Sequence, residues 1–363
     1  MPKIDLKNFT RAALIDYAKE LGWSPFRGTQ IFSWLYRPGI SDFSQMTDLA
    51  KVARAELAER TMISRLEPDK REVSEDGTIK YAFRLDDGQV IESVLIPEED
   101  RNTLCVSSQV GCAMGCQFCL TGTMGFKRNL TPAEIVNQIL AVRDDLPMTM
   151  CNSGDRRNGC INNLVFMGMG EPLANFDNLL TALEILMDQS GLDFSGRRVT
   201  VSTCGLVPRM RELGERIAIN LAVSLHSVDN RVRSQLMPVN DKYPVEMLLE
   251  ACRNYPMPNR RMIMFEYILI KDLNDSDTDA RQLARKLADM RCKINLLPFN
   301  PCPELPYEQP SRTRILAFQK ILWDAGFTVF IRFSRGSDIS AACGQLASRV
   351  GAVEQAIAAE EDV

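Results

Sequence analysis

The chain has 363 residues, of which 45% are hydrophobic and 25% are charged. This composition indicates a globular protein with one large or two unequal domains, and it excludes a disordered, collagenous or low-complexity chain. No stretch approaches the roughly 18 apolar residues of a transmembrane helix, and the first ten residues lack the basic and apolar regions of a signal peptide. We therefore expect a cytoplasmic protein that does not bind membranes.

The net charge of −4 excludes a bulk electrostatic attraction for nucleic acid, so any RNA site must be a local basic patch. The 11 cysteines are odd in number and follow no export signal, which argues against a disulfide framework. We expect them to be metal ligands, reactive thiols or core residues.

In the first 100 residues, the spacing of apolar residues changes from a helical to a strand-like pattern. Residues 1 to about 70 carry apolar side chains at helical spacing, interrupted by glycine and proline, which predicts a small helical domain. Residues 78–96 form two alternating runs around Asp87-Gly88, which predicts a β-hairpin. We expect the helical domain over 1–75 and the hairpin, as a linker, over 76–99.

From Leu104 onward, short apolar runs alternate with helical stretches. The runs have the length and β-branched content of parallel strands buried on both faces. One helix has a clear start, with Thr131 as N-cap, Pro132 first and Glu134 three residues after the cap. Six or seven such units predict an α/β fold, and a closed or partial barrel fits them better than an open sheet. We assign the barrel to 100–345 and a C-terminal tail to 346–363.

The unusual residues follow the ends of these runs. GCAMGCQFC follows the first run, and GMGEP, STCG, SLHS and PFNP follow later ones. Ligands bind at the carboxyl ends of strands in such folds, so we expect all five segments at one mouth of the barrel.

Cys112, Cys116 and Cys119 form a C-x3-C-x2-C motif in the first of these loops. Thiolates suit iron–sulfur clusters or zinc, but a structural zinc site needs four ligands, and His226 is the only histidine. Three ligands that leave one metal position open therefore predict a catalytic iron–sulfur cluster. A zinc site and a chance grouping of core cysteines are the alternatives.

The neighbouring segments resemble a known family. The CxxxCxxC loop is the signature of the radical S-adenosylmethionine superfamily, and TLCVSSQVGC, GFKRNLTPAEI, VFMGMGEPL, VSLHS and LLPFNP are similar to bacterial methyltransferases that modify carbon 2 of adenine in 23S ribosomal RNA and transfer RNA. The resemblance covers nearly the whole chain, apart from a polar stretch near 148–163. It implies a partial (β/α)6 barrel, a 4Fe–4S cluster on the three cysteines and S-adenosylmethionine on its open iron. It also implies that the helical domain and hairpin bind RNA.

The resemblance further implies a set of residues that bind S-adenosylmethionine. A glycine lets the backbone approach a ligand, and polar side chains orient the amino, carboxylate and ribose groups. The matching residues are Gly170, Glu171, Ser202, Ser224, His226 and Asn300.

Methylation of an electron-poor ring carbon explains why further thiols are needed. In the family, a cysteine accepts a methyl group from one S-adenosylmethionine, and a radical made from a second molecule activates that methyl for addition to the ring. A second thiol then releases the RNA by forming a disulfide. Cys343 matches the methyl carrier, Cys105 the resolving thiol, and Glu92 the carboxylate that takes the ring proton. The six remaining cysteines are expected to be core or loop thiols.

The sequence gives weaker evidence for the residues that contact RNA and for the other partners than for the metal-binding residues. Basic pairs offer candidate RNA contacts, namely Lys127/Arg128, Arg156/Arg157, Arg197/Arg198, Arg260/Arg261 and Arg332/Arg335. The target adenine must leave its stack, as in a ribosomal RNA loop or next to a tRNA anticodon. The resemblance implies an electron donor such as flavodoxin or ferredoxin, and we expect a monomer. A sibling enzyme that methylates carbon 8 and a non-enzymatic metal-containing RNA-binding module are the alternatives.

Overall fold

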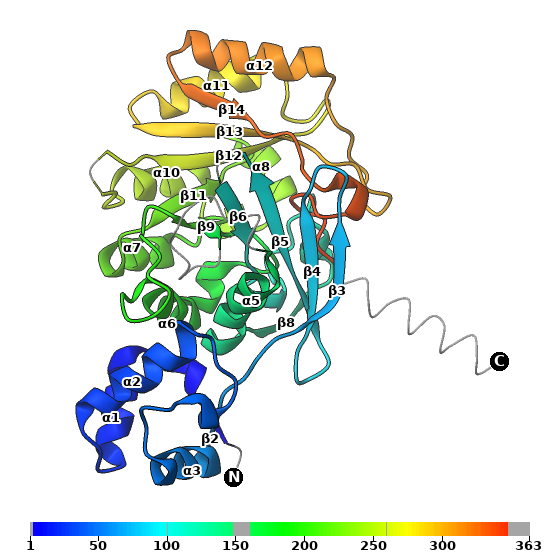
Figure 1. The fold of residues 1–363 in the computed structure, drawn as a ribbon. Coiled ribbons are helices and arrows are strands. Elements are labelled where there is room, and N and C mark those ends of the chain that lie inside the picture. The colour runs from blue at the N-terminus through cyan, green and yellow to red at the C-terminus, as the bar shows by residue number, and fades with distance from the viewer. Residues whose placement is uncertain (1–2, 100, 148–159, 259, 348–363) are drawn as a thin grey trace, which may run out of the picture.

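The computed structural model describes residues 3–99, 101–147, 160–258 and 260–347 (Figure 1). Most of the polar stretch near 148–163, Arg156, Arg157, Cys151 and most of the C-terminal tail lie outside these residues. In the described part, no helix has the length and apolar character needed to cross a membrane.

The N-terminal unit is helical, as predicted. Leu14, Phe32 and Leu57 are buried core residues on its three main helices, of which the first two pack on each other. Thr10 caps the first of them, because its side chain accepts a hydrogen bond from the backbone of Ala13. The unit contains β1 (Ile4–Asp5), η1 (Leu6–Asn8), α1 (Arg11–Glu20), α2 (Pro25–Tyr36), η2 (Phe43–Gln45), α3 (Lys51–Arg60) and β2 (Thr61–Met62).

A ten-stranded sheet forms the centre of the described part of the chain, in the order β14-β13-β12-β11-β10-β9-β6-β5-β4-β3. Seven neighbouring strands are parallel, and each corresponds to one of the seven apolar runs. These strands are β6 (Arg101–Cys105), β9 (Ile161–Phe166), β10 (Val199–Thr203), β11 (Asn220–Ser224), β12 (Ile263–Leu269), β13 (Cys292–Pro298) and β14 (Thr328–Ile331). Because β14 and β3 are edges of the sheet, the barrel is partial, as predicted.

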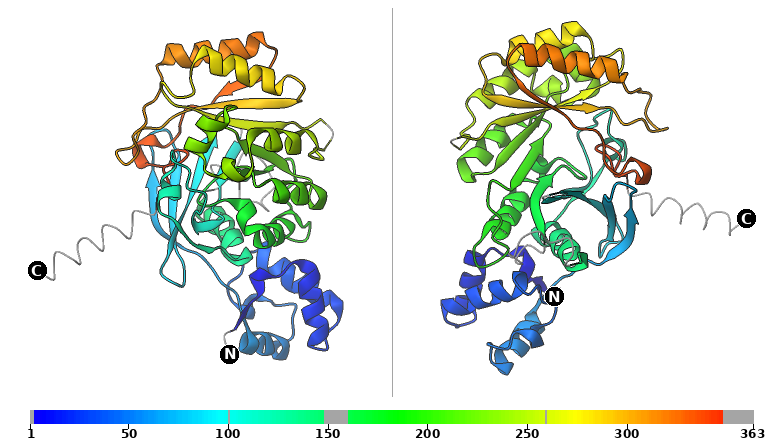
Figure 2. Two further views of the ribbon diagram at one scale, coloured as in Figure 1. Left: turned by 180° about the vertical axis from the view of Figure 1, so that it is seen from behind. Right: turned by 45° about the horizontal axis from the view of Figure 1, so that its top comes forward.

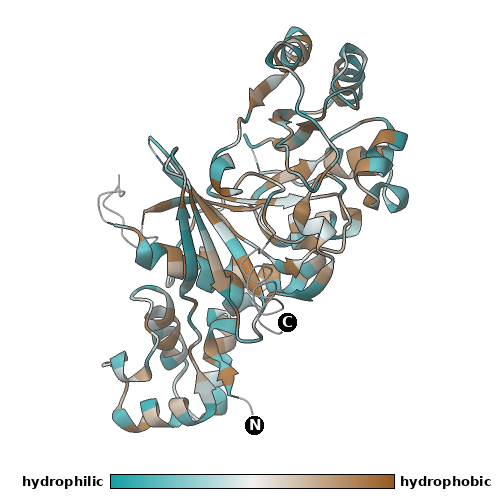
Figure 3. Ribbon diagram, turned by 90° about the vertical axis from the view of Figure 1, so that its right-hand side faces the viewer, coloured by the Kyte–Doolittle hydropathy of each residue, from teal (hydrophilic) through white to brown (hydrophobic). Residues whose placement is uncertain are grey.

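Helices follow the strands and cover the outer face of the sheet (Figures 1 and 2). The capping box predicted at Thr131 is present, with Glu134 as its partner. Figure 3 shows apolar residues along the central strands, and the buried ones belong to the hydrophobic core. The larger helices are α5 (Pro132–Asp145), α6 (Phe176–Met187), α7 (Val207–Arg216), α10 (Val245–Arg253), α11 (Asp277–Leu287) and α12 (Arg312–Asp324).

The short elements lie mainly in the loops between strands and helices. They are β7 (Gln109–Gly111), α4 (Leu120–Thr123), β8 (Phe126–Asn129), η4 (Pro172–Asn175), α8 (Asn230–Leu236), α9 (Val239–Lys242) and η5 (Ser337–Ile339). β7 and β8 pair into a small separate sheet.

The predicted hairpin is present as β4 (Ile79–Arg84) and β5 (Val90–Glu98), joined at Asp87-Gly88. It is part of the main sheet, because β5 pairs with β6 and extends the parallel strands by antiparallel ones. One further strand, β3 (Pro68–Val73), pairs with β4 at the edge. Sequence patterning missed β3 because its side chains are charged and exposed, which is common for an edge strand.

Candidate active site

The three motif cysteines lie in the loop between β7 and α4, beyond the carboxyl end of β6. Gly111 makes this loop possible, because it has a φ of 71° and an added Cβ would lie 1.9 Å from the carbonyl oxygen of Gly125. Cys112, Cys116 and Cys119 are free and partly exposed. The predicted cysteine loop is therefore present at the predicted mouth.

The thiols of this loop influence one another electrostatically. Burial is the main cause that raises the pKa of each thiol, to about 11 for Cys112, and the neighbouring thiols add to this for Cys112 and Cys116. The thiols are therefore neutral at pH 7, and metal ions would have to displace their protons. In the described ranges, no three metal-binding side chains are already gathered around one point. The donor set nevertheless fits iron, because three soft thiolates from one loop leave a fourth metal position open.

The segment that carries Cys343 packs directly on this loop. The backbone N–H of Leu120 donates to the carbonyl of Gly344 at 2.8 Å, and the Thr121 hydroxyl donates to the carbonyl of Leu346 at 2.7 Å. An added Cβ on Gly344 would lie 3.2 Å from the carbonyl oxygen of Phe118, within the loop. Residues more than 220 positions apart in the chain therefore meet at the mouth of the barrel.

Two predicted site residues hold the same segment. The Glu92 carboxylate, on β5, accepts a hydrogen bond from the backbone N–H of Ala347 at 3.0 Å. The Asn300 side chain donates to the carbonyl of Cys343 at 3.4 Å and accepts from the Ser334 hydroxyl. Glu92 is buried, and Lys80 Nζ lies 3.9 Å from its other oxygen.

The β3–β4 turn also contacts this C-terminal region (Figures 1 and 2). The Ser74 hydroxyl donates to Asp338 at 2.5 Å, the Asp76 carboxylate accepts from the backbone N–H of Gly336 at 3.0 Å, and Lys80 Nζ donates to the carbonyl of Ile339 at 2.6 Å. The hairpin was expected as part of an RNA-binding accessory unit. In the structure, Lys80 of this hairpin, together with the β3–β4 turn, holds the chain that leads to Cys343.

Cys105 and Cys343 differ in exposure. Cys105 is the last residue of β6 and is 8% exposed, whereas Cys343 is exposed. Burial, followed by the interaction with the Cys343 thiol, holds the pKa of Cys105 well above its usual value. The surrounding protein, followed by the Glu266 carboxyl, raises the pKa of Cys343 to about 11. The Cys343 thiol therefore lies close enough to Cys105 to influence the pKa of Cys105.

Gly170 and Glu171 connect neighbouring strands. The Glu171 carboxylate accepts hydrogen bonds from the backbone N–H groups of Leu173 at 3.1 Å and Cys204 at 2.8 Å, and thereby joins the loops after β9 and β10. Gly170 has a φ of 96°, and an added Cβ would lie 2.5 Å from Cβ of Gln109. Contact with a ligand was the expected reason for this glycine, but the close approach of Gln109 already requires it.

Ser202 and Ser224 lie at the ends of β10 and β11 and are partly exposed. In the described part of the protein, no hydrogen-bond partner is recorded for either hydroxyl. His226 differs, because it is buried and its Nδ1 accepts a hydrogen bond from the backbone N–H of Ile268 at 3.0 Å. Burial lowers the pKa of His226 to about 3, so the ring is neutral. Only Nε2 is left for a ligand, and the ring meets Phe118 edge-on at 4.7 Å.

Sequence reasoning missed Glu266 and Arg233. Glu266 lies on β12 between Ser224 and Asn295, and Asn295 donates to it at 2.8 Å. Burial raises its pKa to about 7 against the opposing effects of Asn295 and then Arg332. A carboxylate inside the apolar run IMFEYILI was a usable signal for Glu266. Arg233 offered none, because arginines are common on helix surfaces.

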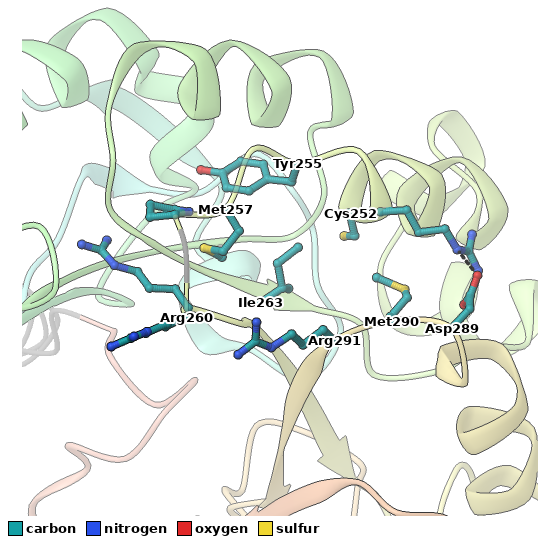
Figure 4. A pocket seen from close by; sticks show the side chains of 11 residues that line it. Cys252, Tyr255, Met257, Arg260, Ile263, Asp289, Met290 and Arg291 are labelled. Carbon is teal, nitrogen blue, oxygen red and sulfur yellow. Dashed lines mark hydrogen bonds and ion pairs between the residues drawn. The ribbon is translucent and has the colours of Figure 1, made fainter.

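The basic pairs fall into different parts of the molecule. Arg128 is paired with Asp87 and Glu134, and exposed Arg332 and Arg335 follow β14 near the mouth. Other arginines surround a pocket of about 390 Å³ at the amino ends of β12 and β13 (Figure 4). This pocket lies at the opposite ends of the strands from the cysteine loop, and it is lined in part by Arg253, Tyr255, Arg260, Arg261 and Arg291.

The prediction that the remaining cysteines are core or loop thiols agrees with the structure for some of them but not for all. Cys204, Cys252 and Cys292 are buried free thiols, as expected, and Cys302 is a partly exposed one. Cys160 is disulfide-bonded, so it is not the free thiol that the sequence predicted.

Two sequence families match this chain. Residues 4–63 match the ribosomal RNA large subunit methyltransferase N-terminal domain, and residues 106–284 match the radical SAM superfamily. A protein of Desulfotalea psychrophila named dual-specificity RNA methyltransferase RlmN is 59% identical over 95% of both chains. A protein of the same name from Geobacter sulfurreducens is 52% identical over 97% of this chain and 94% of its own.

A solved structure supports the same relationship. The crystal structure of a radical SAM methyltransferase from Sphaerobacter thermophilus is 44% identical and superimposes with a TM-score of 0.86. The match covers 95% of this chain and 99% of the other, so the N-terminal unit and the barrel are shared.

Proposed function

Because this chain belongs to the RlmN family of dual-specificity RNA methyltransferases, we propose that it methylates carbon 2 of adenine in 23S ribosomal RNA and in transfer RNA through a methylated Cys343. The alternative of carbon 8 has no support in the names of the relatives described above. The alternative of a non-enzymatic RNA-binding module does not agree with the names of these relatives, which are methyltransferases.

The packing of the Cys343 segment on the cysteine loop carries this proposal. A methyl carrier must reach both the place where S-adenosylmethionine binds and the target base, so it has to stand at the mouth of the barrel. The hydrogen bonds of Leu120 and Thr121 to the carbonyls of Gly344 and Leu346 support this position for Cys343. Those of Glu92 and Asn300 hold the segment from two other sides.

Cys112, Cys116 and Cys119 would hold a 4Fe–4S cluster, with S-adenosylmethionine beside it. Together, these two groups supply radical chemistry when bound. Glu171 holds the two strand ends against each other, and the partly exposed Ser202 and Ser224 offer hydroxyls to the ligand. His226 would contribute through Nε2 alone, because its Nδ1 is occupied.

The reactive side chains would act in sequence. The Cys343 thiol loses its proton and takes a methyl group from one S-adenosylmethionine. This methyl group then loses one hydrogen atom to the radical chemistry of the second S-adenosylmethionine, and its carbon is joined to carbon 2 of adenine with loss of one electron and of the ring proton. Glu92 accepts the ring proton. The Cys105 thiolate then attacks the Cys343 sulfur to form a disulfide, and the electron pair of the broken carbon–sulfur bond leaves with the RNA methyl carbon, which is protonated.

The remaining parts of the proposal concern stoichiometry and partners. Two S-adenosylmethionine molecules are used per turnover, one for each half of the reaction. A flavodoxin or ferredoxin would supply the electrons, and the enzyme would act as a monomer in the cytoplasm.

The test uses the full chain, reconstituted anaerobically with iron and sulfide. The protein is incubated with S-adenosylmethionine bearing a deuterated methyl group and with ribosomal RNA or tRNA transcripts, and the nucleosides are analysed by mass spectrometry. We expect deuterated 2-methyladenosine, 5′-deoxyadenosine and a methyl adduct on the Cys343 peptide. A Cys343→Ser variant should bind iron normally but give no methylated RNA. Formation of 8-methyladenosine, or absence of 5′-deoxyadenosine from iron-loaded enzyme, would contradict the proposal.

A further inference from the structure

Arg233 is a fully buried cation beside the cysteine loop. It lies on α8, with 0% of its surface exposed. Its Nη2 donates to the carbonyls of Cys204 at 2.8 Å and Ser224 at 3.2 Å, and its Nε donates to the carbonyl of Leu225 at 3.1 Å. Its Nη1 donates to Asn240 at 2.9 Å. Every one of these acceptors is neutral.

The positive charge of Arg233 has no balancing carboxylate. In the part of the chain that the structure describes, no acidic side chain forms an ion pair with it. Burial lowers the pKa of Arg233 to about 10, so the guanidinium still carries its charge at pH 7. A buried charge without a partner of opposite sign is costly, which makes this arrangement unusual for a purely structural residue.

The groups that interact with this charge are thiols. The helix that carries Arg233 packs on the cysteine loop, because the backbone N–H of Gln117 donates to the carbonyl of Leu236 at 2.9 Å and Cys116 packs against the cluster that contains Leu236 and Cys204. The charge of Arg233 acts on the thiols of Cys204, Cys116 and Cys252, and Cys116 belongs to the metal-binding motif. Cysteines that bind iron are thiolates, so loading of the motif would bring negative charge next to Arg233.

Arg233 also joins two strand ends. The two Nη2 hydrogen bonds connect Cys204, which directly follows β10, to Ser224 at the end of β11, and β10 itself carries Ser202. The planar guanidinium reaches all four acceptors at once, and a lysine ammonium in the same place cannot.

We propose that Arg233 is a positioning residue that stabilises the reduced, iron-loaded cysteine loop by its charge and aligns the strand ends that bind S-adenosylmethionine. This inference rests on the proposed function, because it requires a cluster on Cys112, Cys116 and Cys119. A nearby positive charge favours the more negative, reduced state, so it should raise the reduction potential.

Two substitutions separate charge from geometry. Arg233→Gln removes the charge, whereas Arg233→Lys keeps it and loses most of the hydrogen bonds. Arg143→Gln is the control, because Arg143 is also buried but lies on α5, where it donates to the carbonyl of Tyr36 at 2.7 Å and pairs with Asp144 at 2.9 Å. The measurements on reconstituted protein are iron per chain, the reduction potential from an EPR-monitored titration, and the dissociation constant of S-adenosylmethionine.

We expect Arg233→Gln to bind less iron or to show a lower reduction potential, and Arg233→Lys to keep a potential near that of the wild type. Both should bind S-adenosylmethionine about tenfold more weakly, which corresponds to roughly 1.4 kcal/mol. Arg143→Gln should change none of these values. Wild-type potential and affinity in Arg233→Gln would overturn the inference. If that variant does not fold, wild-type affinity in Arg233→Lys would overturn it instead. A wild-type chain that takes up no iron would contradict the proposed function itself.

Discussion

The two ends of the parallel strands carry charged and titratable residues in very different settings. At the carboxyl ends, Glu92, Glu171, His226 and Arg233 are 4% exposed or less, and each is hydrogen-bonded to backbone groups of a neighbouring segment. At the amino ends, arginines such as Arg260 and Arg291 are exposed around an open pocket (Figure 4).

This difference shows that the fold places the groups suited to chemistry in buried positions at one end of the strands and leaves surface charge at the other. A buried polar group is fixed in place by its partners, and its pKa and orientation are set by the protein. An exposed arginine keeps its hydration and contributes mainly long-range attraction, which salt screens. Substitutions of these buried groups at the carboxyl ends should therefore have large and specific effects, whereas substitutions of exposed arginines should have small effects at either end.

The largest effect is expected for Cys116→Ala. Two remaining thiolates should not retain a cluster with an open iron, so iron content should fall and 5′-deoxyadenosine should drop to background. Iron analysis and chromatography of the products provide the measurements. Arg291→Ala, at the opposite ends of the strands, should leave both values unchanged. Normal 5′-deoxyadenosine formation by Cys116→Ala would refute the assignment of the cysteine loop.

Cys105→Ala should stop the reaction later, after the bond to RNA has formed. Cys343 would then remain linked through one carbon to adenine, because no thiol is available to resolve the adduct. A protein–RNA species stable to boiling in detergent and thiol should accumulate, and nuclease digestion should leave a nucleotide on the Cys343 peptide. Cys292→Ala is the control, since it removes another buried strand thiol at the amino end of β13. If Cys105→Ala turns over without forming an adduct, Cys105 is not the resolving thiol.

Glu266→Gln should change how stability depends on pH. Burial raises the pKa of Glu266 from 4.5 to about 7, so the folded protein binds this proton more tightly than the unfolded chain does. The contribution of this protonated carboxyl to the free energy of unfolding is complete below pH 4.5, and it is lost as the pH rises through 7. From pH 5 to 8, the wild type should therefore lose on the order of 3 kcal/mol relative to the variant.

Urea unfolding at several pH values measures this difference. Glu246→Gln serves as the control, because the hydrogen bond from Lys286, followed by that from Asn230, lowers the pKa of Glu246 to about 2, below the tested range. The control should give a constant difference between pH 5 and 8. A constant difference for Glu266→Gln as well would mean that Glu266 ionises normally.

The smallest effect concerns RNA affinity. Arg332 is exposed near the mouth, and its charge influences both Glu266 and Cys343. Arg332→Ala should weaken RNA binding a few-fold, and the slope of log affinity against log salt should fall by about one, as expected for one lost phosphate contact. Arg291→Ala should change neither. A larger loss with Arg291→Ala would place the RNA at the amino ends of the strands.

The sequence alone determined the features that depend on near neighbours. The periodicity of short apolar runs predicted the seven parallel strands, Asp87-Gly88 predicted the hairpin turn, and Thr131 with Glu134 predicted a capped helix. These patterns are reliable because strand alternation, turn conformation and helix capping involve residues a few positions apart. The spacing of Cys112, Cys116 and Cys119 is also a local pattern, because these residues lie three or four positions apart.

The tertiary structure alone decided the contacts between distant segments. The hold of the β3–β4 turn on the Cys343 segment joins residues about 260 positions apart, and the bond of Thr121 to Leu346 spans 225. The occupied Nδ1 of His226, the requirement for glycine at position 170 and the buried charge of Arg233 likewise depend on neighbours from other strands. No local pattern encodes such contacts, because they exist only after the chain has closed these loops and buried the groups together.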